Sequence, residues 1–167
     1  MSMIQGILQE LEMEAATTAR VLDRVPNDKL AWKPHAKSMS LGQLAMHIAT
    51  IPGAIASMAQ LPEMPLPTLV QASVENAAQL RPLLDESMAT ARKVLGGMDD
   101  AALARTWRLT DGVREVMALP VGGMLRMIML NHWYHHRGQL SVYLRQLDIP
   151  LPSIYGPSAD ENPFVAK

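Results

Sequence analysis

Three of the five histidines in this chain, His132, His135 and His136, fall within the stretch MIMLNHWYHHRGQL at 127–140. The residues around them are mostly apolar and typical of a buried helix. Uncompensated imidazoles in an apolar core are unfavourable, and two protonated ones repel each other. A divalent metal removes both problems because it binds the neutral nitrogens. The alternative is that each histidine has a buried hydrogen-bond partner of its own.

The expected direction of each histidine follows from a helix of about 100° per residue. If His132 is placed at zero, His136 falls at ~40°, within an apolar stripe on the inward face. That stripe consists of Leu125, Met129, Tyr143 and Leu147. His135 falls at ~300°, on the flank, and Arg137 at ~140°, away from the core. The i, i+4 spacing predicts that His132 and His136 chelate one cation from a single helix, with His135 as the adjacent alternative.

A third histidine, His47, is predicted to point inward from another helix. It shares a helical stripe with four apolar residues, Leu44, Ile51, Ala54 and Met58. Facing the pair, it would complete a three-histidine site with an open coordination position, as in catalytic rather than structural metal sites. The sequence permits this meeting without requiring it. The remaining histidine, His35 in WKPHAKS, is expected in a solvent-facing loop.

Composition limits the classes of protein to which the chain can belong. Its 167 residues suit a single domain, predicted over 1–167, with a hydrophobic core. The formal net charge is −1 and the 15 Lys and Arg residues are scattered, which argues against a nucleic-acid partner. The absence of cysteine excludes disulfides, thiolate metal sites and a cysteine nucleophile, and it fits a reducing cytoplasm. The opening MSMIQGILQELEMEAA lacks the basic-then-apolar order of a signal peptide.

Apolar periodicity predicts four long helices. The first helix covers 3–24, and the second begins at the capping pair Ser40 and Gln43. The third covers roughly 70–95 and ends before Gly96-Gly97, and the fourth covers about 120–147. Pro52 is expected to kink the second helix or break it for one residue. The run 38–62 around it has no charged residue but is too polar to span a membrane. This helix is therefore expected to be buried on most sides, in the core or also at a subunit interface.

The connection between the third and fourth helices is expected to be irregular. Asp99 can cap a short helical turn through Arg105, and Asp111-Gly112 suits a small hairpin, although an extended loop fits as well. The last residues, 148–167, form a turn-rich tail that is expected to pack on the helices. The prediction is an all-α fold, a four-helix bundle with a short irregular insert.

Several segments together resemble the DinB/YfiT-like family of candidate metalloenzymes. They are WKP at 32–34, SLGQLAMHIA around His47, NHWYHHRGQLSVYLR around His132 and His136, and DIPLPSIYGPSADE after the last helix. The resemblance covers nearly the whole chain. It implies a four-helix bundle, often a homodimer, in which His47, His132 and His136 hold a divalent metal. Zinc or nickel is usual in relatives, and three histidine nitrogens suit either.

The resemblance also bears on activity. Characterised relatives include S-transferases that use low-molecular-weight thiols such as bacillithiol or mycothiol, and a maleylpyruvate isomerase. The first hypothesis is a metal-dependent enzyme that activates a small-molecule thiol or water, as a transferase or a hydrolase does. The alternative is a non-catalytic, metal-stabilised or ligand-binding helical protein with a role in stress. The amides of Gln139 and Gln43 are candidates to orient His136 and His47, although hydrogen bonds to other groups in the core fit them equally well.

Overall fold

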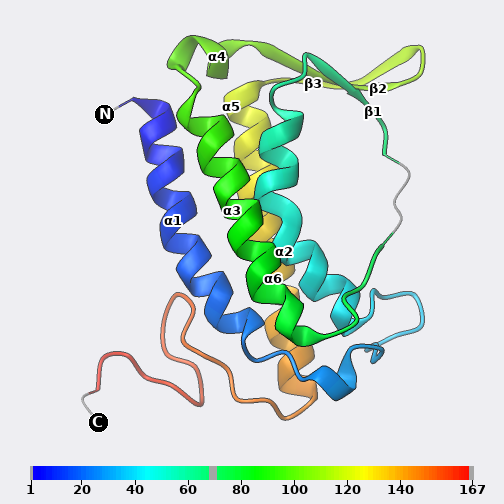
Figure 1. Cartoon of the computed structure of the whole chain (residues 1–167), viewed down its shortest axis with the longest axis vertical. Coiled ribbons are helices and arrows are strands. Elements are labelled where there is room, and N and C mark those ends of the chain that lie inside the picture. The colour runs from blue at the N-terminus through cyan, green and yellow to red at the C-terminus, as the bar shows by residue number, and fades with distance from the viewer. Residues whose placement is uncertain (1, 68–70, 166–167) are drawn as a thin grey trace.

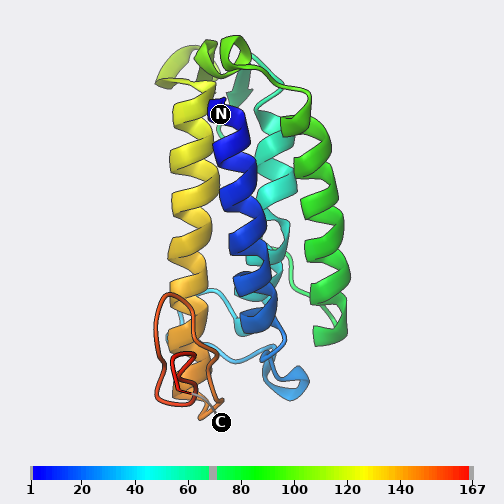
Figure 2. The ribbon, with the colours of Figure 1, turned by 90° about the vertical axis from the view of Figure 1, so that its left-hand side faces the viewer.

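Four long helical segments lie side by side (Figures 1 and 2). The computed structural model describes residues 2–67 and 71–165. The long segments are α1 (Met3–Leu22), α2 (Leu41–Met58), α3 (Leu80–Gly96), and a continuous run of α5 (Val121–Met124), the π-helical η3 (Leu125–Asn131) and α6 (His132–Gln146). Short elements connect them: the 3₁₀ turns η1 (Asn27–Lys29) and η2 (Ala77–Gln79), and the helix α4 (Asp100–Ala104). None of the helices in the described ranges is long and apolar enough to cross a membrane.

A three-stranded mixed sheet covers one end of the helices (Figure 1), so the prediction of an all-α four-helix bundle is wrong. β1 (Glu63–Pro65) pairs in parallel with β2 (Thr106–Asp111), and β2 pairs antiparallel with β3 (Arg114–Pro120). The hairpin alternative is confirmed, with Gly112 at a φ of +64° in its turn. β1 gave no sequence signal because three residues are too few to show alternation, and proline is tolerated in an edge strand.

Side-chain caps fix where the helices begin. Ser40 Oγ accepts from the Gln43 backbone N–H at 3.2 Å, and Gln43 Oε1 accepts from the Ser40 N–H at 2.8 Å, so the predicted capping box is confirmed. The start predicted for the third helix is wrong, since α3 begins only at Leu80, after η2. Asn76 Oδ1 accepts from the Ala78 N–H at 2.8 Å and caps η2, which leads directly into α3. Residues 71–76 are non-helical, and 68–70 lie outside the described residues.

The helix α2 is buried on most sides, as its charge-free composition predicts. Eleven of its residues are buried: Leu41, Gly42, Leu44, Ala45, Ile48, Ala49, Ile51, Pro52, Gly53, Ile55 and Ala56. The helix continues through Pro52 without a break. At Gly53 it touches α3 so closely that a Cβ there would lie 2.7 Å from the backbone oxygen of Ser87. This contact fixes α2 against α3, and the opposite side of α2 faces the last helix.

The C-terminal segment follows an irregular path over one end of the helices (Figure 2). Ile149, Leu151 and Ile154 pack against the core. Two ion pairs also hold the segment: Glu161 pairs with Arg20 of α1, and Asp160 pairs with Arg145 of α6. Of the predicted tail, residues 166 and 167 lie outside the described part of the chain.

Candidate metal centre

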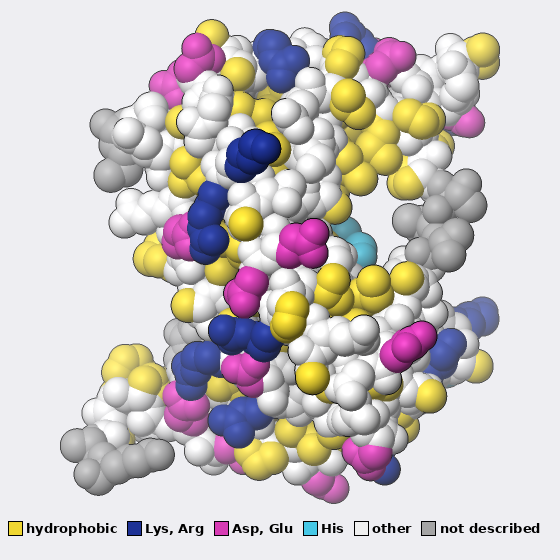
Figure 3. Space-filling model, in the orientation of Figure 1, with side chains coloured by type: hydrophobic (Ala, Val, Ile, Leu, Met, Phe, Trp, Pro, Cys, Tyr) yellow, Lys and Arg dark blue, Asp and Glu magenta, His cyan; other side chains and the backbone are white. Residues whose placement is uncertain are grey.

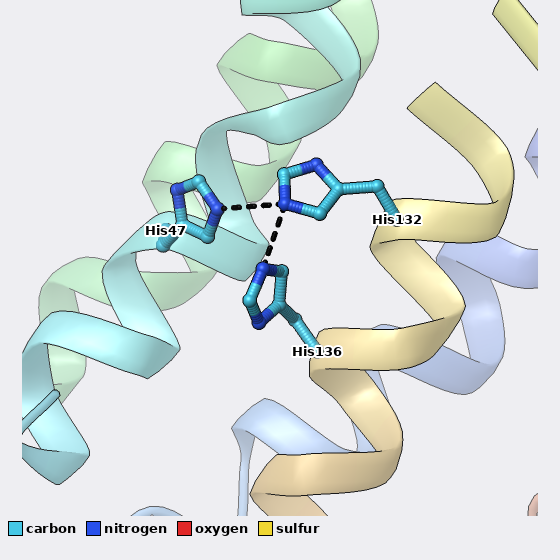
Figure 4. A group of neighbouring side chains, drawn as sticks. All are labelled: His47, His132 and His136. Atoms are coloured by element: carbon cyan, nitrogen blue, oxygen red, sulfur yellow. Dashed lines mark hydrogen bonds between the residues drawn. The ribbon is translucent and has the colours of Figure 1, made fainter. Parts of the chain in front are cut away.

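Three histidine side chains from two helices point toward one another (Figure 4). His47 comes from α2, and His132 and His136 come from the start of α6. The Nε2 atoms of His47 and His132 are 3.5 Å apart, and those of His132 and His136 are 2.7 Å apart. One ligand atom from each histidine lies within 4.8 Å of the other two. The structure therefore brings together the three residues singled out from the sequence as a group that could hold a metal ion.

Two of these rings are held from outside through Nδ1. His132 Nδ1 lies 3.2 Å from the backbone oxygen of Ile128, and His136 Nδ1 lies 2.7 Å from Gln139 Oε1. Both partners are carbonyl oxygens that only accept, so these contacts favour the tautomer in which Nδ1 carries the proton and donates. Each Nε2 then presents a lone pair toward the other. Two lone pairs at 2.7 Å repel unless a metal ion or a proton shared between the two nitrogens relieves the contact.

The donor set fits a divalent transition metal. In a tetrahedral zinc site with Zn–N bonds of ~2.1 Å, neighbouring ligand nitrogens are ~3.4 Å apart. The observed separations of 2.7 and 3.5 Å lie on either side of that distance. Neutral imidazole nitrogens suit zinc, copper, iron and nickel, and an all-histidine set disfavours magnesium or calcium, which prefer oxygen.

Burial keeps these histidines neutral. Desolvation lowers the pKa of His47, and the neighbouring His132 lowers it further. Desolvation also lowers the pKa of His132, against the opposing hydrogen bond to Ile128. The pKa of His136 falls to about 4, again mainly through desolvation and against the bond to Gln139. The nitrogens are therefore available to a metal at neutral pH without losing a proton.

The π-helical segment η3 turns the histidines to the edge of the core. In a π turn the backbone N–H of residue i donates to the carbonyl of residue i−5, so the turn holds one residue more than an α turn. One extra residue displaces the following side chains by about 100° relative to an uninterrupted α-helix. The buried residues of α6 are accordingly Trp133, Arg137, Leu140 and Leu144. His132 and His136 lie beside this stripe and are only half-buried, rather than in the middle of the core as predicted.

Arg137 is buried and only 1% exposed, so its predicted direction away from the core is wrong. Its guanidinium lies 2.5 Å from the Glu14 carboxylate of α1 and donates to Thr18 Oγ1 at 3.1 Å. It also donates to the hydroxyl of Tyr155 in the C-terminal segment at 2.5 Å. A buried cation needs such partners because desolvation is costly. Arg137 therefore joins α6 to α1 and to the C-terminal segment, on a different side of α6 from the histidine cluster.

The remaining candidates divide into those beside the cluster and those away from it. Gln139 contacts His136, whereas Gln43 has the other role left open by the sequence and is satisfied away from His47. The Gln43 amide completes the helix cap and donates to the backbone oxygen of Gln71. His135 is exposed, with its ring centroid 5.1 Å from that of His136, and it does not join the group. His35 is exposed in a loop, as predicted.

The cluster lies near open space. Histidine atoms are visible in a hollow on the face shown in Figure 3. An open pocket of about 720 Å³ between α3 and the segment before it reaches Met46, the residue before His47. A smaller groove of about 300 Å³ between α2 and α3 includes Thr50, one turn after His47. The larger pocket alone has the size of a small-molecule site, and none of the three histidines is among the described lining residues of either pocket.

Sequence comparison places this architecture in a known family. The model of the DinB family matches residues 1–163, and the chain belongs to the DinB family. This confirms the resemblance drawn from the segments around the histidines. The uncharacterized protein YrdA of Bacillus subtilis (strain 168) is 25% identical over 167 aligned residues, which cover 95% of this chain and 91% of YrdA.

Two solved structures share the fold. A DinB-like protein from Bacillus cereus ATCC 10987 superimposes with a TM-score of 0.72 at 24% identity, covering 90% of this chain and 97% of that chain. The DinB-like protein YjoA from Bacillus subtilis superimposes with a TM-score of 0.67 at 21% identity, covering 89% and 96%. At these identities the likeness shows the fold alone.

Proposed function

We propose that His47, His132 and His136 bind a divalent metal, zinc or nickel, and that the protein is a metal-dependent enzyme for small-molecule substrates. One observation carries the proposal: three neutral imidazoles direct ligand nitrogens to a common point, and two of them are oriented by carbonyl acceptors. Such outer partners are typical of metal-binding histidines. The competing explanation, separate hydrogen-bond partners, leaves the Nε2 lone pairs of His132 and His136 facing each other at 2.7 Å.

An open coordination position favours catalysis over a purely structural role. Within the described ranges, no further His, Cys, Asp or Glu joins the three histidines. Three protein ligands leave a position for an exogenous group, whereas structural zinc sites have four. A metal bound there would lower the pKa of a thiol or water in that position and so supply a nucleophile at neutral pH. The chain has no cysteine, so a thiol must come from a substrate.

The charge of the pocket that reaches Met46 limits the kinds of electrophile that could react there with a thiol. Glu75 and Glu86 line the pocket beside Met46, and no Lys or Arg is among its described lining residues. Negative side chains disfavour a phosphate or carboxylate at that position. The pocket therefore suits a neutral or positively charged electrophile. The thiolate would form a carbon–sulfur bond to it and displace its leaving group, while the thiol proton passes to water.

Metal analysis of purified protein tests the proposal. Wild type should contain about one zinc or nickel ion per chain, while His47→Ala, His132→Ala and His136→Ala should each contain much less. His135→Ala is the matched control, because it removes a neighbouring imidazole that does not join the group. A metal-free wild type, or ligand variants that retain the metal, would show that the site is not a metal centre. Chelation should also lower the midpoint of thermal unfolding, since the metal binds only the folded state.

Turnover separates the enzyme from a non-catalytic metal-stabilised or ligand-binding protein. Metal-loaded protein should consume a low-molecular-weight thiol with a generic neutral electrophile, and His136→Ala should not. Failure with every thiol, together with hydrolysis of an activated ester, would favour the hydrolase. Full metal occupancy with neither reaction would favour the binding protein. The homodimer remains a proposal, and sedimentation equilibrium tests it directly.

A further inference from the structure

A proline in α2 frees a carbonyl that the last helix uses. Pro52 has no backbone N–H, so the carbonyl of Ile48, four residues earlier, lacks its usual helical donor. The indole N–H of Trp133 on α6 donates to this oxygen at 2.8 Å. Ile48 and Trp133 are both fully buried. The indole N–H and the Ile48 carbonyl thus satisfy each other across the interface between the two helices.

This hydrogen bond lies directly beside the metal centre. Ile48 follows His47, and Trp133 follows His132, so the two pairs have the same separation of 85 residues along the chain. Moving α6 along α2 by one residue would leave a buried donor and a buried acceptor without partners, which is costly. The bond therefore fixes the position of α6 relative to α2 at the level where His47 faces His132.

The other side of α2 is held at the same level. Ser87 Oγ on α3 accepts from the Gly53 N–H at 2.8 Å and donates to the backbone oxygen of Thr50 at 3.1 Å. Backbone groups on both sides of Pro52 thus bond to side chains of neighbouring helices. These bonds fix α2 against α3. The bond from Trp133 therefore positions α6 against α2, and with it the distance between His47 and His132.

We propose that Trp133 is a positioning residue of the metal centre, and that its indole N–H, using the carbonyl freed by Pro52, holds His47 opposite His132. The inference rests on the proposed metal site. It assigns a metal-directed role to a core tryptophan that does not touch the metal. It also gives Pro52 a role in the site, because the freed carbonyl is the acceptor that the indole requires.

The matched pair Trp133→Phe and Trp107→Phe tests the proposal. Both substitutions keep a buried aromatic ring and remove an indole N–H, but Trp107 Nε1 has no hydrogen-bond partner among the described residues. The probe is Co²⁺ alone, titrated into metal-free protein and followed by its visible ligand-field bands. Trp133→Phe should weaken Co²⁺ binding by about tenfold, the lower end of the range for residues that orient ligands, and should change the bands because His47 and His132 are no longer held at the same separation. Trp107→Phe should leave both unchanged.

Pro52→Ala tests whether the bond from Trp133 positions the helices or only supplies the Ile48 carbonyl with a hydrogen-bond donor. An amide restored at position 52 can donate to the Ile48 carbonyl within α2. In this background, Trp133→Phe should cost less stability in urea unfolding, yet Co²⁺ binding should stay weak because no bond joins the two helices.

Two results would overturn the inference: Trp133→Phe binding Co²⁺ as wild type does, or Pro52→Ala restoring the affinity of Trp133→Phe. Wild-type protein that binds no Co²⁺ would instead refute the metal site itself, and the inference with it.

Discussion

The side-chain oxygen of Gln139 accepts a hydrogen bond at 2.7 Å from Nδ1 of His136, one turn earlier on α6. This bond favours the tautomer in which the lone pair of His136 Nε2 faces His132, and it would raise the basicity of that nitrogen toward a bound metal. Gln139→Leu should therefore weaken zinc binding by about tenfold to a hundredfold. Gln146→Leu is the control, an exposed glutamine later on the same helix. Calorimetric titration of metal-free protein with zinc measures both, and equal affinities would exclude the orienting role.

The lowered histidine pKa values predict how the stability of metal-free protein depends on pH. Between about pH 4, the folded value for His136, and about pH 6.5, the unfolded value, the unfolded chain binds more protons than the folded one. The free energy of unfolding should therefore rise with pH through this window and gain nothing further from these groups above it. Urea unfolding at several pH values measures the slope. His136→Gln should reduce it, and an unchanged slope would contradict the burial argument.

The buried pair of Arg137 and Glu14 should contribute far more to stability than an exposed pair. Arg137→Met removes the cation beside the largely buried Glu14 carboxylate, which keeps only its hydrogen bond from the Tyr155 hydroxyl, and should cost about 3 kcal/mol in unfolding free energy. Arg92 and Glu12 form the matched control, with side chains about half exposed, and Arg92→Met should cost less than about 1 kcal/mol. Chemical denaturation of the two variants gives the comparison. Similar losses would mean that Arg137 is held by packing rather than by its charge.

Gly53 should be intolerant of any side chain. Gly53→Ala places a Cβ 2.7 Å from the backbone oxygen of Ser87, and the forced separation of α2 and α3 should cost about 1–3 kcal/mol. At Gly6 in α1, a Cβ would meet no atom within 4 Å. Gly6→Ala should instead stabilise the protein by about 0.5–1 kcal/mol through helix propensity. Thermal unfolding measures the change in stability of each variant relative to wild type, and the two changes should have opposite signs.

The histidine set could be found from sequence because its signals are local. The i, i+4 spacing places His132 and His136 on one face of any α-helix, whatever surrounds it. The cap at Ser40 identifies the helix that carries His47. Their meeting in space depends on how two helices pack 85 residues apart in the chain, which spacing alone does not contain.

The errors have equally physical causes. Extending one helical period from Leu125 to Leu147 ignored η3, so Arg137 was predicted to point outward. The hydrophobic pattern shows the shift only when the stripes before and after η3 are considered separately. β1 is stabilised by pairing with a distant strand rather than by its own residues. The late start of α3 follows the 3₁₀ turn η2, which Asn76 caps. Asparagine favours caps over helix interiors because its side chain bonds to nearby backbone groups.

The π-helical segment has a consequence for variation within the family. Its effect on His132 and His136 depends on the number of residues between Leu125 and Asn131, and not on which apolar side chains they carry. We expect substitutions here to be frequent among relatives that keep the three histidines, and insertions or deletions to be rare. Deletion of one residue would turn His132 and His136 away from α2, although all three histidines would still be present in the sequence. The presence of the histidines alone therefore does not identify a family member able to bind a metal.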